Sequence, residues 1–457
     1  MFGIYLKFRG LSAKGFDMLH ALGITMSHKW TGNATERISK AAMEEVVRSM
    51  QEFAWLISHD NVQIPFRVFA QRLDNQGEFG DGTAATVYIK RDSTPLPQST
   101  NADLKKQRAQ GLLDPITEEF TCDLAEKSWP RIKAHATHHI LCFLLETPEF
   151  DYQTYSGKDD AALKPPTPVN ELPAGPAHVT LQYLLGTVNI PEASYKDNVR
   201  LMEEWYKQLG WKNIGDKMKV ALEKVVAWIG DQLTVDRLRG LFKFKAEDEN
   251  SFERMDFAVL IFGWFHLQMA FANSLHKQYL GTSSGRGLKQ AFELLERKGL
   301  ARTLTKGPFH HDLNEALHHV AEAHILEDWL VVSGAASISE LRSRSPGELR
   351  DLATKLVQER ASSNALDELD KLPVDKKDKQ KRQLVQWNRD VLQYIALDHA
   401  IRHGDVGLME DMLPHLLFRF IGGQNSKYAN EILELLQGLH REWPSDVASV
   451  LPFQFPY

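Results

Sequence analysis

The chain has 457 residues, 43% hydrophobic and 25% charged, which is the composition of a globular protein with more than one structural unit. Its 54 basic and 60 acidic residues give a formal net charge of -6, which excludes a uniformly basic nucleic-acid coat protein but not a local basic channel. There is no apolar run of membrane-spanning length, no signal-peptide pattern at the start, and only two cysteines, Cys122 and Cys142. These features predict a protein of the nucleus or cytoplasm, without disulfides and without a membrane partner.

The first half of the chain is predicted to contain four strands separated by helices and loops. Helical periodicity over residues 39–51 indicates an N-terminal helical segment, residues 1–52. A buried strand, 53–58, then ends at His59, Asp60 and Asn61. A proline-rich insertion, 92–176, is expected to be mostly loop around one helix near 132–145. The other predicted elements of this half are strands at 83–90, 178–185 and 224–230 and a helix at 195–209.

Beyond Asp231 the chain is predicted to be almost wholly helical. The segments with apolar periodicity near 3.6 residues are 255–280, 286–298, 312–332, 346–371, 376–402, 405–417 and 425–441. We therefore expect an α/β core over residues 53–240, a helical insertion domain over 241–420, and a C-terminal helix within 421–457 that returns to the core.

Two apolar strands each deliver an aspartate, Asp60 after the first and Asp231 after the fourth. Because the carboxyl ends of parallel strands meet at one edge of a sheet, the two carboxylates are expected to lie close together and to hold divalent cations, Mg2+ or Mn2+. Glu431, beside the buried stripe of a late helix, is the expected third acid, and Glu434 is the alternative. Taken singly, each acid fits an ordinary turn or surface residue better than a metal ligand, and it is their order along the chain that favours a site.

This order of strands, aspartates and a late glutamate resembles the ribonuclease H-like core of DDE-type transposases. In those enzymes the first Asp follows strand one, the second follows strand four, and the Glu lies on a late helix, often after a large helical insertion. The resemblance implies a ribonuclease H-like mixed sheet interrupted by an all-helical insertion, with Asp60, Asp231 and Glu431 as catalytic metal ligands. One family motif is incomplete, because Gly263 stands where a Cys or Asp would precede His266 by three residues.

The sequence is also similar to a fungal family of unknown function, number 6589. The similar segments extend over nearly the whole chain and include GDQLTVDRLRGL, FGWFHLQMAFANSLHKQYLGTS, KGPFHHDLNEALHHVAEAHI and NSKYANEILELL. This resemblance supplies no activity, so the functional expectation depends on the transposase-like layout.

Several basic residues are candidate DNA contacts: Arg237, Arg239, His266, Lys277 and Arg286. The histidine-rich segment 309–324 has spacings that could bind zinc, but it also fits an amphipathic helix with Leu313, Leu317 and Val320 on its core side. His135, His138 and His139 are interpreted as ordinary helix residues.

The sequence therefore predicts metal-dependent DNA strand cleavage and transfer, by an active enzyme or by a domesticated descendant. DNA is the expected partner, and self-association and a longer parent protein are left open. Two alternatives remain: a non-catalytic DNA- or protein-binding protein that retains the fold, and a helical interaction scaffold with no sheet.

Overall fold

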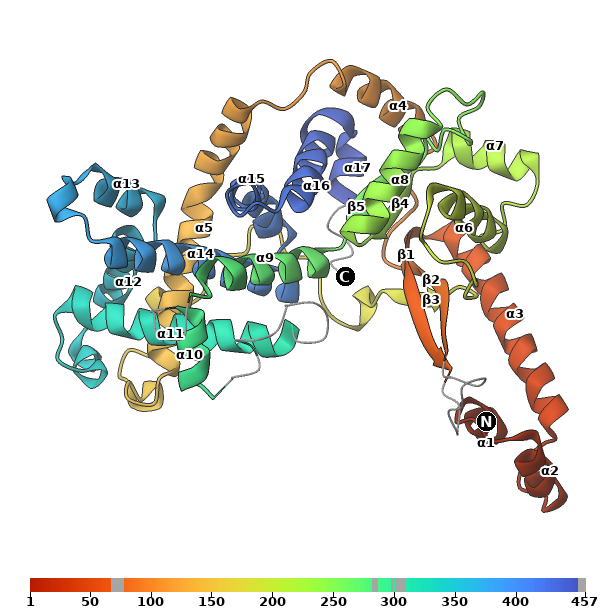
Figure 1. The fold of residues 1–457 in the computed structure, drawn as a ribbon, viewed down its shortest axis with the longest axis horizontal. Coiled ribbons are helices and arrows are strands. Elements are labelled where there is room, and N and C mark those ends of the chain that lie inside the picture. Colours follow the sequence, from red (N-terminus) through yellow and green to blue (C-terminus); the bar gives the residue numbers. More distant parts are fainter. Residues whose placement is uncertain (67–77, 282–286, 297–299, 301–309, 451–457) are drawn as a thin grey trace. The chain divides into compact units, whose positions relative to one another are not determined.

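The computed structural model describes residues 1–66, 78–281, 287–296, 300 and 310–450 (Figure 1). The chain forms two compact units, each built from two stretches of sequence. Unit 1 comprises residues 1–105 and 174–261, and unit 2 comprises residues 106–173 and 262–457. Within the described part of the chain, no helix is both long and apolar enough to cross a membrane.

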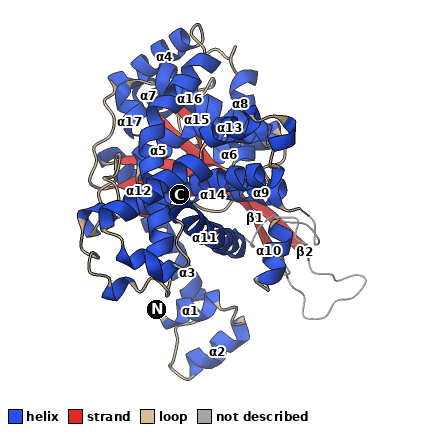
Figure 2. Cartoon of the chain, turned by 90° about the vertical axis from the view of Figure 1, so that its left-hand side faces the viewer, coloured by secondary structure: helices blue, strands red, loops and turns tan. Residues whose placement is uncertain are grey.

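Unit 1 is organised around a mixed five-stranded sheet, whose strands are red in Figure 2. The strand order is β3-β2-β1-β4-β5. β1 pairs antiparallel with β2 and parallel with β4, and β3 pairs antiparallel with β2. The strands are β1 (Ala54–Phe66), β2 (Glu78–Lys90), β3 (Leu181–Leu184), β4 (Val226–Gly230) and β5 (Ala258–Phe262). The protein is therefore a mixed α/β structure, and a scaffold built from helices alone is excluded.

Three of the predicted strands are confirmed as β2, β3 and β4, and the first is longer than expected. Instead of ending at Ser58, β1 continues to Phe66 because it pairs with β2 along its whole length. β5 corrects the predicted helix 255–280, whose first part is a strand. Its five residues, AVLIF, are almost all buried, and a short, uniformly apolar run carries no periodicity that distinguishes strand from helix.

The helices of unit 1 pack on the sheet through a core rich in aromatic side chains. The cluster includes Trp205 and Tyr206, Trp228 of β4, and Phe252 and Phe257. Several of the helices begin at Ser, Asn or Asp side chains that accept a backbone N–H of the first turn. The helices are α1 (Phe2–Phe8), α2 (Ala13–Ala21), α3 (His28–Glu52), α4 (Ser99–Gly111), which crosses into unit 2, α6 (Tyr195–Gln208), α7 (Ile214–Glu223) and α8 (Gln232–Phe244).

In its described residues unit 2 is helical, as predicted for the second half of the chain. Its helices are α5 (Glu118–Glu146), α9 (Trp264–Tyr279), α10 (Leu288–Leu294), α11 (His310–Ser333), α12 (Pro346–Arg360), α13 (Ser363–Lys371), α14 (Lys379–His403), α15 (Val406–Gly422), α16 (Ser426–Gln437) and α17 (Ser445–Val450). Its short 3-10 helices are Tyr152–Thr154, Ala161–Leu163, Ile338–Ser343 and Val374–Lys376, and a π-helical turn lies at Gly438–Glu442; the 3-10 helix Pro176–His178 belongs to unit 1.

The proline-rich region 92–176 is more helical than predicted, because α4 and the 29-residue α5 both lie within it. Pro130 lies inside α5, so a proline that suggests a break in sequence is here accommodated within a helix. α5 packs against α12, α14 and α15, and its buried side chains join a hydrophobic core cluster of unit 2 together with Trp329 and Leu356. The burial of this face explains why the helix persists.

Candidate functional site

Asp60 and Asp231 each lie just beyond the paired residues of the two neighbouring parallel strands β1 and β4. Ser58 of β1 lies opposite Ile229 of β4, and the two aspartates each follow by two residues. Asp60 is not at a strand end, as the sequence suggested, but lies inside β1 opposite Ala84 of β2. β1 extends past the end of β4, so both aspartates still lie at the carboxyl end of β4. Asp60 is exposed and Asp231 is half-buried.

Asp231 links β4 to α8 and is the N-cap residue of that helix. Its Oδ1 accepts the backbone N–H of Thr234 at 2.7 Å. The preceding residue must be glycine, because a Cβ at Gly230 would lie 2.5 Å from Cγ2 of Thr234. The turn therefore holds the Asp231 carboxylate at the start of a helix, where the helix dipole favours negative charge.

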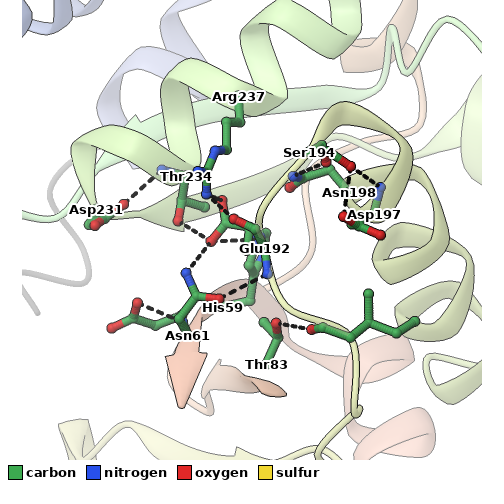
Figure 3. Close-up of polar contacts among 12 residues, drawn as sticks. His59, Asn61, Thr83, Glu192, Ser194, Asp197, Asn198, Asp231, Thr234 and Arg237 are labelled. Carbon is green, nitrogen blue, oxygen red and sulfur yellow. Dashed lines mark hydrogen bonds and ion pairs between the residues drawn. The ribbon is translucent and has the colours of Figure 1, made fainter. Parts of the chain in front are cut away.

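A third carboxylate, Glu192, reaches the same region from the loop between β3 and α6. Thr83 of β2 holds this loop, exchanging backbone hydrogen bonds with Val188 at 2.8 and 2.9 Å and donating its hydroxyl to the carbonyl of Ile190 at 2.7 Å. The loop thus runs along β2 and brings Glu192 beside β1 and α8 (Figure 3). Only 3% of Glu192 is exposed.

The contacts to Glu192 come from β1 and α8. Asn61 accepts the Glu192 N–H at 2.9 Å and donates its side-chain amide to Glu192 Oε2 at 3.4 Å. Thr234 donates its hydroxyl to the same carboxylate oxygen at 2.8 Å. Arg237 of α8 donates to the backbone carbonyl of Glu192 and lies 3.7 Å from its Oε1. The residues that follow Asp60 and Asp231 therefore position this buried acid.

The electrostatics of Glu192 link it to both aspartates. The pKa of Glu192 is raised to about 7, chiefly by burial and in smaller part by the negative charges of Asp231 and Asp60. The Thr234 hydrogen bond and the Arg237 charge act in the opposite direction. Both aspartates are thus close enough to act on Glu192, which carries its proton in a large fraction of molecules near neutral pH.

His59, next to Asp60 in β1, completes the buried part of the site. It is 2% exposed, accepts a hydrogen bond from Trp228 at 2.7 Å, and has its Nε2 3.9 Å from Glu192 Oε2. Burial lowers the pKa of His59 to about 4, against the opposing effect of the Asp231 charge. His59 is therefore neutral at physiological pH, and its contact with Glu192 is not an ion pair there.

Glu431, the expected third acid, lies on α16 in unit 2 and is 2% exposed, whereas the alternative Glu434 is exposed on the same helix. The assignment of Glu431 as a metal ligand stays a prediction.

The sequence did not single out Glu192 as a site residue. Glu192 lies in a loop without periodicity, and nothing in its sequence neighbourhood marks it as buried.

The predicted DNA contacts are distributed over both units. Arg237 and the half-buried Arg239 lie on α8 of unit 1. On α9 of unit 2, His266 is half-buried with its ring against Phe265, and Lys277 is exposed. Arg286 falls outside the described residues. These assignments also stay predictions.

Over the described ranges, no group of three or more His, Cys, Asp or Glu side chains is arranged to hold a metal ion. The histidine-rich segment forms α11, and its apolar residues, Leu313, Leu317 and Val320 among them, are buried as expected for an amphipathic helix. His318 on this helix lies 3.8 Å from Asp398.

A family model described as a family of unknown function (DUF6589) matches residues 111–452. The matched region contains Glu192, Asp231 and Glu431 but not Asp60. Searches of curated proteins and of solved structures gave no match.

Proposed function

We propose that this chain, which belongs to the family of unknown function DUF6589, is a metal-dependent phosphodiester-cleaving enzyme of the DDE transposase kind. The proposed site is the carboxyl end of β4. The observation that carries this proposal is that Asp60 and Asp231 each follow by two residues the paired positions Ser58 and Ile229 of the adjacent parallel strands β1 and β4. It is supported by the order in which strand one carries the first aspartate and strand four the second, as in the ribonuclease H-like core that the sequence resembles.

The donor set at this edge suits a hard divalent cation such as Mg2+ or Mn2+. Carboxylate oxygens are the ligands that these ions prefer, and Asp60 and Asp231 provide them from neighbouring strands. The effect of both negative charges on the pKa of Glu192 indicates an excess of negative charge that a cation would offset. A cation held by the two aspartates would stabilise the charge on the attacking and leaving oxygens of a phosphodiester.

The remaining residues of the site position these ligands. Thr234 orients Asp231 through its backbone N–H and Glu192 through its hydroxyl. Asn61 fixes the backbone and the carboxyl group of Glu192 relative to β1. The rigid elements β1, β4 and α8 therefore hold all three acids, as a reaction that depends on positioning requires.

A nicking assay tests the proposed function. The full chain is incubated with supercoiled plasmid and Mg2+ or Mn2+, with EDTA as the metal-free comparison. We expect cation-dependent nicking that falls at least about 100-fold in Asp60→Asn and in Asp231→Asn, as is typical when a metal ligand is lost. Asp236→Asn is the matched control, because Asp236 is an exposed aspartate on the same helix, α8, and should keep full activity.

Two results would contradict the proposal: no cation-dependent cleavage by the intact protein, or equal activity in the Asp60, Asp231 and Asp236 variants. The first would favour a non-catalytic protein that retains the fold. Glu431→Gln in the same assay tests the predicted third acid independently of the two aspartates.

A further inference from the structure

Five histidines gather in unit 2 where α5 packs against α14. The ring of His399 on α14 lies 5.3 Å from that of His139 and 6.3 Å from that of His135, both on α5, measured between centroids. His138 lies 6.2 Å from His139, and His403 stacks on His399 at 4.0 Å. We call these five residues the histidine cluster. His135 and His139 are buried, His138 and His399 are half-buried, and His403 is exposed.

The buried rings are poorly satisfied by hydrogen bonds. Four ring nitrogens are buried and have no hydrogen-bond partner among the residues that the structure describes: His135 Nε2, His138 Nδ1, His139 Nε2 and His399 Nδ1. Burial lowers the pKa of each of these four histidines, to about 4 for His138. The rings also lower one another's pKa, since a charge on one disfavours a charge on the next.

The surrounding carboxylates already have other partners. Asp405 accepts three backbone N–H groups, from residues 169, 170 and 408. Asp411 of α15 pairs with Arg131, and Asp398 of α14 pairs with Arg402 at 2.9 Å and accepts a bond from Gln268 of α9.

The other titratable and charged neighbours do not compensate for added positive charge. Arg350 of α12 opposes protonation of His138, and His318 of α11 opposes protonation of His139. Cys142 of α5, at 3.4 Å from His138, is a thiol whose pKa burial raises to about 11, so it carries no negative charge near neutral pH. The negative charges of Asp405, Asp411 and Asp398 favour protonation of His135 or His399, but burial outweighs them. Protons added to the cluster would therefore create positive charges between two packed helices, beside carboxylates that are already engaged elsewhere.

We propose that protonation of the histidine cluster separates α5 from α14. The two helices are packed together at neutral pH (the closed state) and part in mildly acidic solution (the open state). The exposed His403, stacked on the half-buried His399, gives protons a route from solvent to the buried rings. Opening would expose the apolar face of α5 that packs against α12, α14 and α15. This inference is independent of the proposed catalytic function, which concerns unit 1.

The sign of the pH dependence follows from the lowered pKa values. A histidine that is harder to protonate in the closed state contributes its full stabilisation above the ordinary value of 6.5. That contribution is lost as the pH falls below 6.5 toward the closed-state value. In this range, each such ring increases the equilibrium constant for opening by about tenfold for every unit by which the pH falls.

Hydrogen exchange of the full chain, followed by mass spectrometry from pH 7.5 to 5.0 and corrected for intrinsic exchange, tests the proposal. Protection of α5 and of the C-terminal half of α14 should fall together below pH 6.5. In the double variant His139→Gln, His399→Gln, the opening constant should rise less steeply as the pH falls. Each ring removed should take away a factor of about ten per pH unit from that rise. His319→Gln, on the exposed side of α11, is the control and should behave as the unaltered chain.

If the double variant loses protection already at pH 7.5, the single variant His399→Gln replaces it, because the ring of His399 is only half-buried. The proposal is overturned if α5 and α14 keep their protection at pH 5.0. It is also overturned if the histidine variants and the His319 control lose protection with the same pH dependence.

Discussion

Trp228 donates its indole N–H to Nδ1 of His59 at 2.7 Å, between the neighbouring strands β4 and β1. An indole nitrogen can only donate, so Nδ1 must be the acceptor and cannot carry a proton. The single proton of the neutral ring therefore resides on Nε2, which faces Glu192 at 3.9 Å. Protonating His59 would break the bond to Trp228, in agreement with a pKa lowered to about 4 by burial.

Trp228→Phe should destabilise the protein and release this constraint on His59. The loss of a buried hydrogen bond adds about 1–3 kcal/mol to the cost of the smaller ring. Trp205→Phe is the matched control, because Trp205 is equally buried but its Nε1 has no hydrogen-bond partner. Urea denaturation should show the larger loss for Trp228, and nitrogen-detected NMR should report the Nε2–H form of His59 only while Trp228 is present. Equal losses would contradict the importance of the bond.

Glu192→Gln should change how stability depends on pH. The pKa of Glu192 is raised from 4.5 to about 7 in the folded protein. The stabilisation that protonated Glu192 gives the folded state is therefore fully present below pH 4.5 and is lost as the pH rises through 7. The glutamine of the variant does not titrate. As the pH rises between these values, the free energy of unfolding of the variant should therefore gain on that of the unaltered chain by up to about 1.4 kcal/mol per pH unit. Thermal unfolding at pH 5 and pH 8 measures this. The exposed Glu253→Gln should show no such trend.

Gly82→Ala should destabilise unit 1, although the change adds only a methyl group. A Cβ at Gly82 would lie 2.9 Å from the backbone carbonyl oxygen of Val188, in the loop that positions Glu192. Overpacking of this kind costs about 1–3 kcal/mol. Gly347→Ala, in α12 with no atom within 4 Å of the added Cβ, should instead stabilise by up to about 1 kcal/mol. Chemical denaturation of both variants checks the opposite signs.

Asp405→Ala should be among the more damaging single changes in unit 2. Its carboxylate is 3% exposed and accepts the backbone N–H groups of Val169, Asn170 and Leu408 at 3.0–3.1 Å. Removing it leaves three donors without that acceptor, at a cost of about 3 kcal/mol or more. Limited proteolysis should then cut near residues 169–170, which lose their two hydrogen bonds to the Asp405 carboxylate and, among the described residues, keep only the bond from Gly407 N–H to the carbonyl of Asn170. Asp375→Ala, an exposed acid, should leave the cleavage pattern unchanged.

The sequence predicted the parts of the fold whose residues repeat with a clear period. Most helices of unit 2 were found in this way, whereas β2, β3 and β4 were recognised as short apolar or β-branched runs, and Asp231 lies directly after β4 as expected. β5 was mistaken for the start of a helix because a uniformly buried strand has no alternation. The length of β1 was also missed, since it depends on pairing with β2 rather than on its own residues.

The candidate site was only partly accessible to the same reasoning. A glutamate that follows Pro191 in a loop has the local pattern of a surface residue, and its burial depends on Thr83, Asn61 and Arg237, which are distant in sequence. The histidine cluster was missed for a related reason. His135 and His139 fit an ordinary helix, and only the packing of α14 brings His399 against them.

The division of each unit into two sequence segments has a consequence for how the protein can be made and dissected. During synthesis α5 leaves the ribosome long before α12, α14 and α15, the helices against which it packs. Its apolar face must therefore remain without its native cover while the rest of unit 1 is completed, a period in which such surfaces attract chaperones or aggregate. In a fragment that ends near residue 261, the apolar face of α5 would stay without its native packing partners permanently. Isolating unit 2 as a stable domain requires joining residues 106–173 to residues 262–457 in one polypeptide.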